Sequence, residues 1–329
     1  SAAGVASPTR ALKGGGNTPY VAEIDKIEIA TTGNAIDFGD LTSARADAGG
    51  LSSSTRGVFV GGDVNPGVTT GIEQVTIASA GNAIDYGDLR TARKYGGTSS
   101  NSVKGLYAGG GDGDSTLFNT IDQFEITTGG TSTDFGDLSV TRGNVQNGVL
   151  SQSHGGLNEG YQGTRIAPIP RGLGVGQRAL QAGGFSGGQT TIEQFNMVTT
   201  GNASQFGNLA VGSYEMSAMS NTTRCLFAGG EAGDAGDTDR IEYVEFASQG
   251  NGADFGNLLE AKDGITGGSN QTRGLTAGGT NPDHVDVVEY VTLATLGNGT
   301  DFGNLSSTRR HAAGVGGQTR FIVAGGDVS

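Results

Sequence analysis

The chain has 329 residues, of which 62 are glycine and 6 are proline, and its formal net charge is −13. Its 20 basic residues are scattered rather than clustered, which argues against nucleic acid or an anionic membrane as a partner. A single cysteine, Cys225, excludes an intrachain disulfide framework, and no apolar run reaches the roughly 18 residues of a membrane-spanning helix.

A short motif, an aromatic residue followed by Gly, Asp or Asn, and Leu, recurs along the chain. Its aromatic residue stands at Phe38, Tyr86, Phe135, Phe206, Phe255 and Phe302. Successive copies lie about 48 residues apart, except that the interval from Phe135 to Phe206 is about 71 residues. A second anchor, an apolar run ending in Gly-Gly, keeps the same period. Two independent anchors with one period indicate a repeat protein.

Each period predicts four short strands in chain order. The first follows a basic residue and is rich in Gly, Ala and Ser, and the second ends at Gly-Gly. The third places apolar residues two positions apart, as at Val75 and Ile77, so that they share one face of a strand. The fourth carries the aromatic motif after a tight turn such as Gly81-Asn82. Four such strands per repeat predict an all-β propeller.

The phase of the repeat divides one domain, residues 1–329, into six complete blades and a partial seventh. The predicted blades are 1–44, 45–92, 93–141, 142–211, 212–260, 261–308 and the partial 309–329. Their inner strands are expected near Ala2–Ala6, Ala46–Ser52, Lys94–Asn101, Gly143–Leu150, Ser213–Met219, Asp263–Ser269 and Arg310–Gly316. We therefore expect a seven-bladed disc whose last blade lacks its outer strands or receives them from other residues. The alternative is a piece cut from a longer array.

An insertion of about 25 residues, roughly 154–176, explains the long interval in the fourth blade. It falls between the first and second strands, so it should protrude from one rim of the disc. One interpretation is a surface excursion that covers a blade edge. The other is a partner attachment point, with the candidate contact residues Tyr161, Ile166, Pro168, Ile169 and Pro170.

The repeat resembles the kelch repeat of galactose-oxidase-like propellers over essentially the whole chain. A basic residue opens the inner strand, Gly-Gly closes the second, and Val288-Glu289-Tyr290 is similar to the third, although Phe or Tyr replaces the kelch Trp. The wording of segments such as residues 34–41 also resembles repeats in virion structural and tail-fibre proteins of marine phages, especially cyanophages. That resemblance implies a non-enzymatic structural protein located in the virion, which contacts other virion proteins or a host-surface glycan or receptor.

Catalytic chemistry finds little support in the residues. Copper-radical oxidation would need paired Tyr and His ligands, but His154, His284 and His311 stand in unrelated phases of the repeat. No zinc spacing or catalytic triad order is present, so we predict no enzyme, no catalytic residue, no metal site and no required cofactor. The repeated arginines are expected to pair with acids of the aromatic motif, such as Asp40 and Asp88, or to cap carbonyls between blades.

The loops after Gly-Gly vary in length and are acidic. Strand alternation places them on one face of the disc, where recognition residues usually sit. The candidate binding residues are Asp63, Asp112, Asp114, Glu231, Asp234, Asp237, Asp239 and Asp283. Their oxygens would suit Ca²⁺, although the loops match no known calcium motif and solvated turns are the alternative. Two other functions stay open, namely a secreted or cell-surface glycan-binding propeller and an oxidase-like enzyme.

Overall fold

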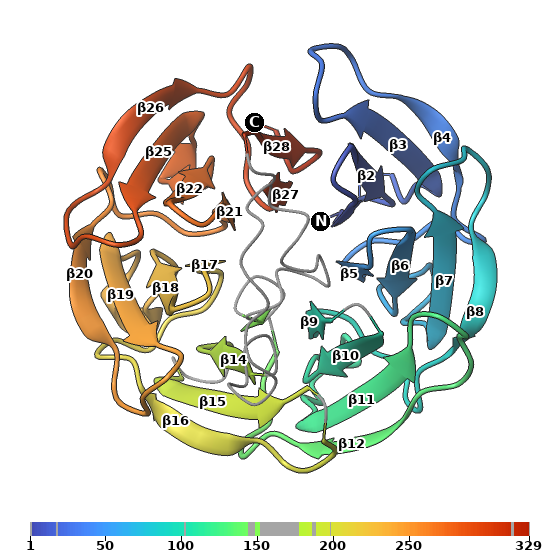
Figure 1. The fold of residues 1–329 in the computed structure, drawn as a ribbon, viewed down its shortest axis with the longest axis horizontal. Helices are drawn as coiled ribbons and strands as arrows, with labels where there is room; N and C mark the ends of the chain where they lie inside the picture. The colour runs from blue at the N-terminus through green and yellow to red at the C-terminus, as the bar shows by residue number, and fades with distance from the viewer. Residues whose placement is uncertain are drawn as a thin grey trace, which may run out of the picture.

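The computed structural model describes residues 2–17, 19–101, 103–143, 149–151, 178–185, 189–197, 199–316 and 319–328. These residues form a ring of antiparallel sheets around a central axis (Figure 1). Six sheets have four strands each, in simple order from the axis outward, and a seventh position holds a two-stranded sheet. The predicted all-β propeller is therefore confirmed, with six complete four-stranded blades.

The innermost strands are short and consist mostly of small residues. They are β1 (Ala3–Ala6), β5 (Gly49–Ser52), β9 (Gly97–Ser100), β13 (Val149–Ser151), β17 (Ser217–Ser220), β21 (Thr266–Ser269) and β27 (Ala313–Gly316). Each contacts the inner strands on both sides, and β27 contacts both β21 and β1, so seven inner strands close the ring. Most begin about three residues later than expected. The preceding residues form instead a single bridge, such as Ala46 with Asp63, and a left-handed turn, as at Asp47.

The outer strands follow in the same order in every complete blade. The second strands are β2 (Arg10–Gly14), β6 (Arg56–Val60), β10 (Lys104–Ala108), β14 (Arg178–Ala182), β18 (Arg224–Ala228), β22 (Arg273–Ala277) and β28 (Phe321–Ala324). The third strands are β3 (Glu23–Glu28), β7 (Gly71–Thr76), β11 (Thr120–Glu125), β15 (Thr191–Asn196), β19 (Arg240–Glu245) and β25 (Val287–Thr292). The fourth strands are β4 (Ile36–Asp40), β8 (Ile84–Asp88), β12 (Thr133–Asp137), β16 (Ser204–Asn208), β20 (Ala253–Asn257) and β26 (Thr300–Asn304). A small hairpin, β23 (Thr280–Asn281) with β24 (Asp283–His284), and the 3₁₀ turn η2 (Gly233–Ala235) lie in loops.

The hydrophobic core lies between neighbouring blades. In the first five blades, the aromatic residue of the fourth strand packs against the two apolar residues at the end of the next blade's third strand. Phe38 thus shares a buried cluster with Val75 and Ile77. Phe135 packs against Phe195 in a T-shaped, edge-to-face arrangement, with ring centroids 6.2 Å apart. This contact explains why the aromatic motif and the period-two apolar pair recur together.

A backbone clasp joins each fourth strand to the next blade. The Gly81 N–H donates to the Phe38 carbonyl at 2.8 Å, and the Ala83 N–H donates to the Asp40 carbonyl at 2.7 Å. The Asn82 side-chain oxygen accepts the Asp40 N–H at 3.1 Å. The two backbone bonds recur at the next four junctions of the ring. The Gly-Asn turn is therefore a joint between blades as well as a hairpin.

The basic residues before the inner strands pair with acids of their own blade's third strand. The buried pairs are Arg45 with Glu73, Arg93 with Asp122, Arg142 with Glu193 and Lys262 with Glu289. The expected pairing of these residues with motif acids such as Asp40 is wrong. The third-strand acid is buried beside the basic side chain, and this cation, together with backbone hydrogen bonds such as that from the Thr42 N–H to Glu73, offsets its lost hydration.

A second set of arginines, at the starts of second strands, caps carbonyls between blades as expected. Arg56 Nη1 donates to the Ile126 carbonyl of the next blade at 2.7 Å. Arg224 Nη1 does the same to the Leu293 carbonyl at 3.1 Å. Each of these arginines therefore holds the end of a third strand in the following blade.

Candidate functional site at the axial face

Five residues at one phase of the repeat surround the axis with left-handed backbone. They stand two positions before an inner strand and have φ between 50° and 61°: Asp47, Tyr95, Glu215, Gly264 and His311. We call these five residues the axial ring, and the face of the disc on which they lie the axial face. For a non-glycine residue this conformation costs about 1–2 kcal/mol, and such strain gathers at functional sites. Four of the five positions hold polar residues other than glycine, and each of them bears this conformational cost.

Two members of the axial ring meet across blades. The His311 Nε2 lies 2.8 Å from Glu215 Oε2, although the two residues come from the seventh and fifth positions of the ring. The His311 N–H also donates to the Gly264 carbonyl at 2.9 Å, which links the seventh and sixth positions. On its other side, His311 Nδ1 lies 3.5 Å from Asp327 Oδ2. The imidazole is thus held between two carboxylates.

Several acidic side chains lie close to one another around His311, and their charges shift the pKa values of their neighbours. Burial, with the nearby charges of Asp237 and Glu215, raises the pKa of Asp263 to about 6. Burial alone would lower the pKa of His311, but the hydrogen bond and charge of Glu215 outweigh it, and the pKa lies above its ordinary value. Burial and the charges of Glu231 and Glu215 also raise the pKa of Asp237. Perturbed groups that cluster in this way mark a candidate site.

Aromatic and basic side chains complete the site in the second and third blades. Burial, followed by the charge of and hydrogen bond to Asp47, raises the pKa of Tyr95 well above its usual value. Lys94 lies over the Tyr95 ring at 5.0 Å from its centroid, and its Nζ is 2.5 Å from Asp63 Oδ2. The arrangement offers carboxylate acceptors beside an aromatic ring, which suits hydroxyl or ammonium groups of a ligand.

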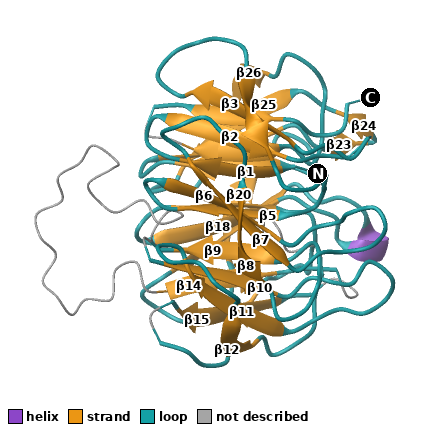
Figure 2. Cartoon of the chain, turned by 90° about the vertical axis from the view of Figure 1, so that its right-hand side faces the viewer, coloured by secondary structure: helices purple, strands orange, loops and turns teal. Residues whose placement is uncertain are grey.

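The structure brings three of the predicted loop residues to this cluster. Asp63 contacts Lys94, and the charges of Glu231 and Asp237 act on Tyr214 and Asp263 respectively. The loops that carry η2 and the β23–β24 hairpin extend from one face of the disc (Figure 2). The expected common face of these two loops is therefore seen.

The other predicted loop residues have local roles. Asp112 Oδ1 accepts the N–H groups of Asp114 and Thr116 at 3.0 and 3.1 Å, as in a solvated turn. Asp239 Oδ2 accepts a hydrogen bond from Asn257 at 2.8 Å. Asp234 lies in η2, and Asp283 lies in β24, where both are exposed.

Further predicted features lie elsewhere. The insertion residues Tyr161, Ile166, Pro168, Ile169 and Pro170 fall outside the described residues. Cys225 is fully buried, and burial raises its pKa, which keeps the thiol protonated. Within the described ranges no group of three or more His, Cys, Asp or Glu residues is arranged to hold a metal ion. In the same part of the chain no helix is long and apolar enough to cross a membrane.

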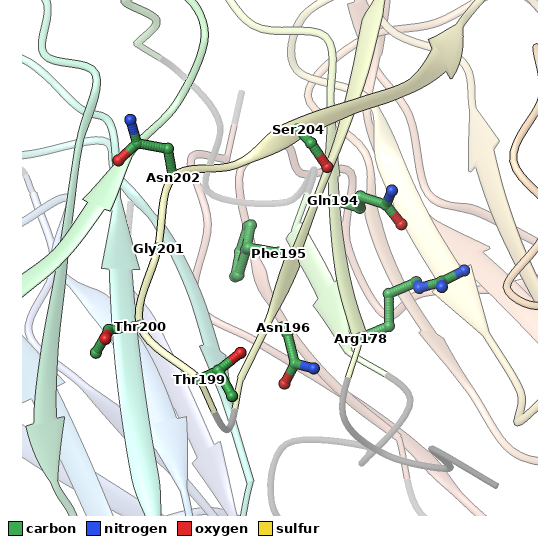
Figure 3. A pocket seen from close by; sticks show the side chains of 9 residues that line it. All are labelled: Arg178, Gln194, Phe195, Asn196, Thr199, Thr200, Gly201, Asn202 and Ser204. Carbon is green, nitrogen blue, oxygen red and sulfur yellow. The ribbon is translucent and has the colours of Figure 1, made fainter.

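A cavity of about 360 Å³ lies at the outer side of the fourth blade. Its lining is mostly polar, and Figure 3 shows Asn202 and Ser204 on one side and Arg178 on the other. Arg178 Nη1 donates to the Phe246 carbonyl, the same capping role that Arg56 has in its blade. The side chain that could give this cavity chemistry is thus already used in joining blades.

Sequence reasoning missed the axial ring because its defining feature is a backbone conformation. A signal was present nonetheless. Asp47, Tyr95 and His311 each stand two residues after the basic residue that opens their blade. A variable polar residue at one fixed phase, among otherwise constant small residues, could have identified the ring.

The comparisons with known proteins place the fold. No family model matches this sequence, and no curated protein matches it. A solved structure entitled "Structure of YjhT" superimposes with a TM-score of 0.62 over 87% of this chain and 91% of that chain, at 12% sequence identity. At this identity the similarity shows a shared propeller fold alone.

The pH dependence of stability tests the cluster around Asp263. The folded-state pKa of Asp263, about 6, lies above its ordinary value. The free energy of unfolding therefore keeps the full contribution of this residue below about pH 4 and loses it as the pH rises through 6. The variant Asp263→Asn cannot ionise at this position, so it should not lose this stability as the pH rises. Between pH 4 and 8 the variant should gain about 1–2 kcal/mol on the wild type, after allowance for partial solvent exposure. Urea denaturation at several pH values measures the gain, and parallel pH curves for the two proteins would contradict the prediction.

Proposed function

We propose that this chain is a non-enzymatic binding module of a virion, a tail, fibre or particle-surface component that contacts a host-surface ligand through the axial face. The observation that carries the proposal is the axial ring, where strained polar residues stand at one phase of a rigid repeat. A rigid scaffold that presents variable side chains at fixed positions is suited to recognition. The virion assignment draws its support from the resemblance of the repeat wording to marine phage proteins.

The chemistry of the site favours a ligand with hydroxyl or cationic groups. Glu215, Asp263 and Asp47 supply carboxylate acceptors, and Tyr95 supplies an aromatic ring. The buried, protonated thiol of Cys225 is unsuited to nucleophilic catalysis, which agrees with a binding role. A secreted or cell-surface glycan-binding propeller is the second candidate, since carboxylates beside aromatic rings also bind sugar hydroxyls.

Binding of the labelled chain to intact host cells tests the axial site. Glu215→Gln should lower the amount retained at least tenfold, because it removes the charge that faces both His311 and Asp263. The matched control is Asp112→Asn, which changes an acid in an exposed turn outside the axial ring. This variant should bind like the wild type. Equal binding by Glu215→Gln would exclude the axial face as the binding site.

Two further measurements separate the candidate functions. Periodate treatment of the cells destroys sugar diols and should abolish binding if the ligand is a glycan, whereas protease treatment should abolish it if the receptor is a protein. Immunogold labelling of purified virus particles should show the chain on the particle. Its absence from particles, with glycan binding intact, would favour the secreted or cell-surface module.

A further inference from the structure

The seventh position of the ring holds an inner sheet with an uncovered outer side. β28 is paired with β27 alone, whereas the second strand of every complete blade also pairs with a third strand. In Figure 1, β28 is the outermost strand at its position. Beside it lies a cavity of about 560 Å³, lined by side chains of the sixth and seventh positions that include Leu275, Leu305 and Phe321.

Phe302 shows what this cavity lacks. Its counterparts Phe38, Phe135, Phe206 and Phe255 are only 2 to 3% exposed, because the next blade's third strand covers them, whereas Phe302 is 57% exposed. The side chain lines the cavity and keeps an edge contact with Tyr290 at 6.1 Å between ring centroids. An apolar pair equivalent to Val75 and Ile77 would therefore bury it.

Within the described part of the chain, Arg309 lacks the acidic partner that the basic residues at the same phase of four other blades have. Its counterpart Arg45 donates to the Gly61 carbonyl at 3.1 Å and to Ser43 Oγ at 3.1 Å, and its Nη2 also pairs with Glu73 of the third strand. Three other blades have the same kind of buried pair between a basic residue and a third-strand acid.

The guanidinium of Arg309 is held in the same way as that of Arg45. It donates to the Gly325 carbonyl at 2.8 Å and to Ser307 Oγ at 2.6 Å, the counterparts of the two contacts of Arg45. Among the described residues no carboxylate lies within ion-pair distance of Arg309. The group is thus oriented toward the place where a third-strand acid would stand.

The two sides of the opening each carry one half of the clasp that joins complete blades, namely fourth-strand carbonyls on one side and a Gly-Asn turn on the other. On the β26 side, the structure shows no N–H group of a neighbouring blade, within the described ranges, donating to the carbonyls of Phe302 and Asn304. On the first-blade side, the turn of Gly33 and Asn34 is exposed, although its counterpart at Gly81 and Asn82 is clasped to the preceding blade. A hairpin between them would complete both joints.

We propose that the seventh position is a binding site for a β-hairpin that follows the rule of the repeat and is supplied from outside the six complete blades. The hairpin brings an acid to Arg309, an apolar pair to Phe302, and a Gly-Asn turn followed by an aromatic-Gly-Asp motif to the two clasps. Each of the six hairpins of third and fourth strands is used within its own blade, so the occupant comes from outside these blades. Strand addition of this kind draws affinity from the main chain and specificity from alternate side chains.

A synthetic peptide with the sequence of residues 69–89 serves as the probe, because its Glu73 is the natural partner of the arginine most similar to Arg309. Fluorescence anisotropy should show saturable binding to the chain, at least tenfold weaker for the Glu73→Gln peptide. The Arg309→Gln protein should bind both peptides equally and weakly. Lys104→Gln, which removes one cation from the third blade, should bind like the wild type.

Three results would overturn the proposal. Absence of peptide binding up to millimolar concentration, or equal binding of the two peptides to the wild type, would overturn the proposal. So would sedimentation data in which the chain is a dimer that must dissociate before peptide binds, because a second copy would then occupy the opening. If Arg309→Gln fails to fold, Phe302→Ser is the substitute, and it should lose the preference for a peptide with Val75 and Ile77 over one with serine at both positions.

Discussion

Lys262→Met should lower the free energy of unfolding by about 3–5 kcal/mol, the cost of leaving one charge of a buried pair without its partner. The Lys262 Nζ lies 2.6 Å from Glu289 Oε1, and both side chains are only 1% exposed. Methionine fills similar space but cannot offset the carboxylate. Urea denaturation followed by circular dichroism measures the change.

Two controls show whether the unpaired charge is the cause. The double variant Lys262→Met/Glu289→Gln should recover most of the loss, since it removes the stranded charge and keeps the amide able to bond the Leu259 N–H. Arg309→Met alters the same phase of the repeat where no acid is paired, and it should cost under about 1 kcal/mol. A loss of equal size in Arg309→Met would mean that side-chain packing, and not charge, decides the effect.

Gly87→Ala should destabilise the ring by about 3 kcal/mol or more. At Gly87, where φ is 133°, an added Cβ would lie 2.2 Å from the Gly130 carbonyl oxygen in the clasp of the second and third blades. The backbone of both blades would have to separate, which adds an overpacking cost to the strain of the left-handed conformation.

Gly303→Ala is a closely matched control for this clash. Gly303 has nearly the same φ, 131°, at the same position of its blade, but nothing lies within 4 Å of an added Cβ. Its cost is therefore the conformational strain alone, and thermal denaturation should place Gly87→Ala at least about 2 kcal/mol below it. Equal costs for the two variants would show that the clasp tolerates separation.

The sequence was enough to predict the fold because its anchors are the contacts that build it. The aromatic residue at the phase of Phe38 recurs because the third strand of the next complete blade packs against it, and the glycine at the phase of Gly81 recurs because it joins two blades. The number of inner strands followed from the same phase. These are constraints on spacing, and spacing is visible in a sequence.

The site and the ion pairs were harder to predict, for two physical reasons. The partner of Arg45 depends on which strand faces inward, and both Asp40 and Glu73 recur with the same period, so the period could not choose between them. The axial ring depends on left-handed backbone at Tyr95 and Glu215, residue types that rarely adopt it. Acidity of the loops drew attention to Asp112 and Asp114, although they form a self-contained turn.

The clasp also bears on how such a chain can change over generations. Its two recurring bonds run between main-chain groups, so they depend little on which side chains the two blades carry. Unequal recombination that duplicates or deletes a whole repeat therefore yields new neighbours that still fit. The axial ring lies outside the clasp, and its five positions already hold five different residue types. Selection can thus diversify the proposed recognition surface residue by residue while the architecture that supports it is inherited unchanged.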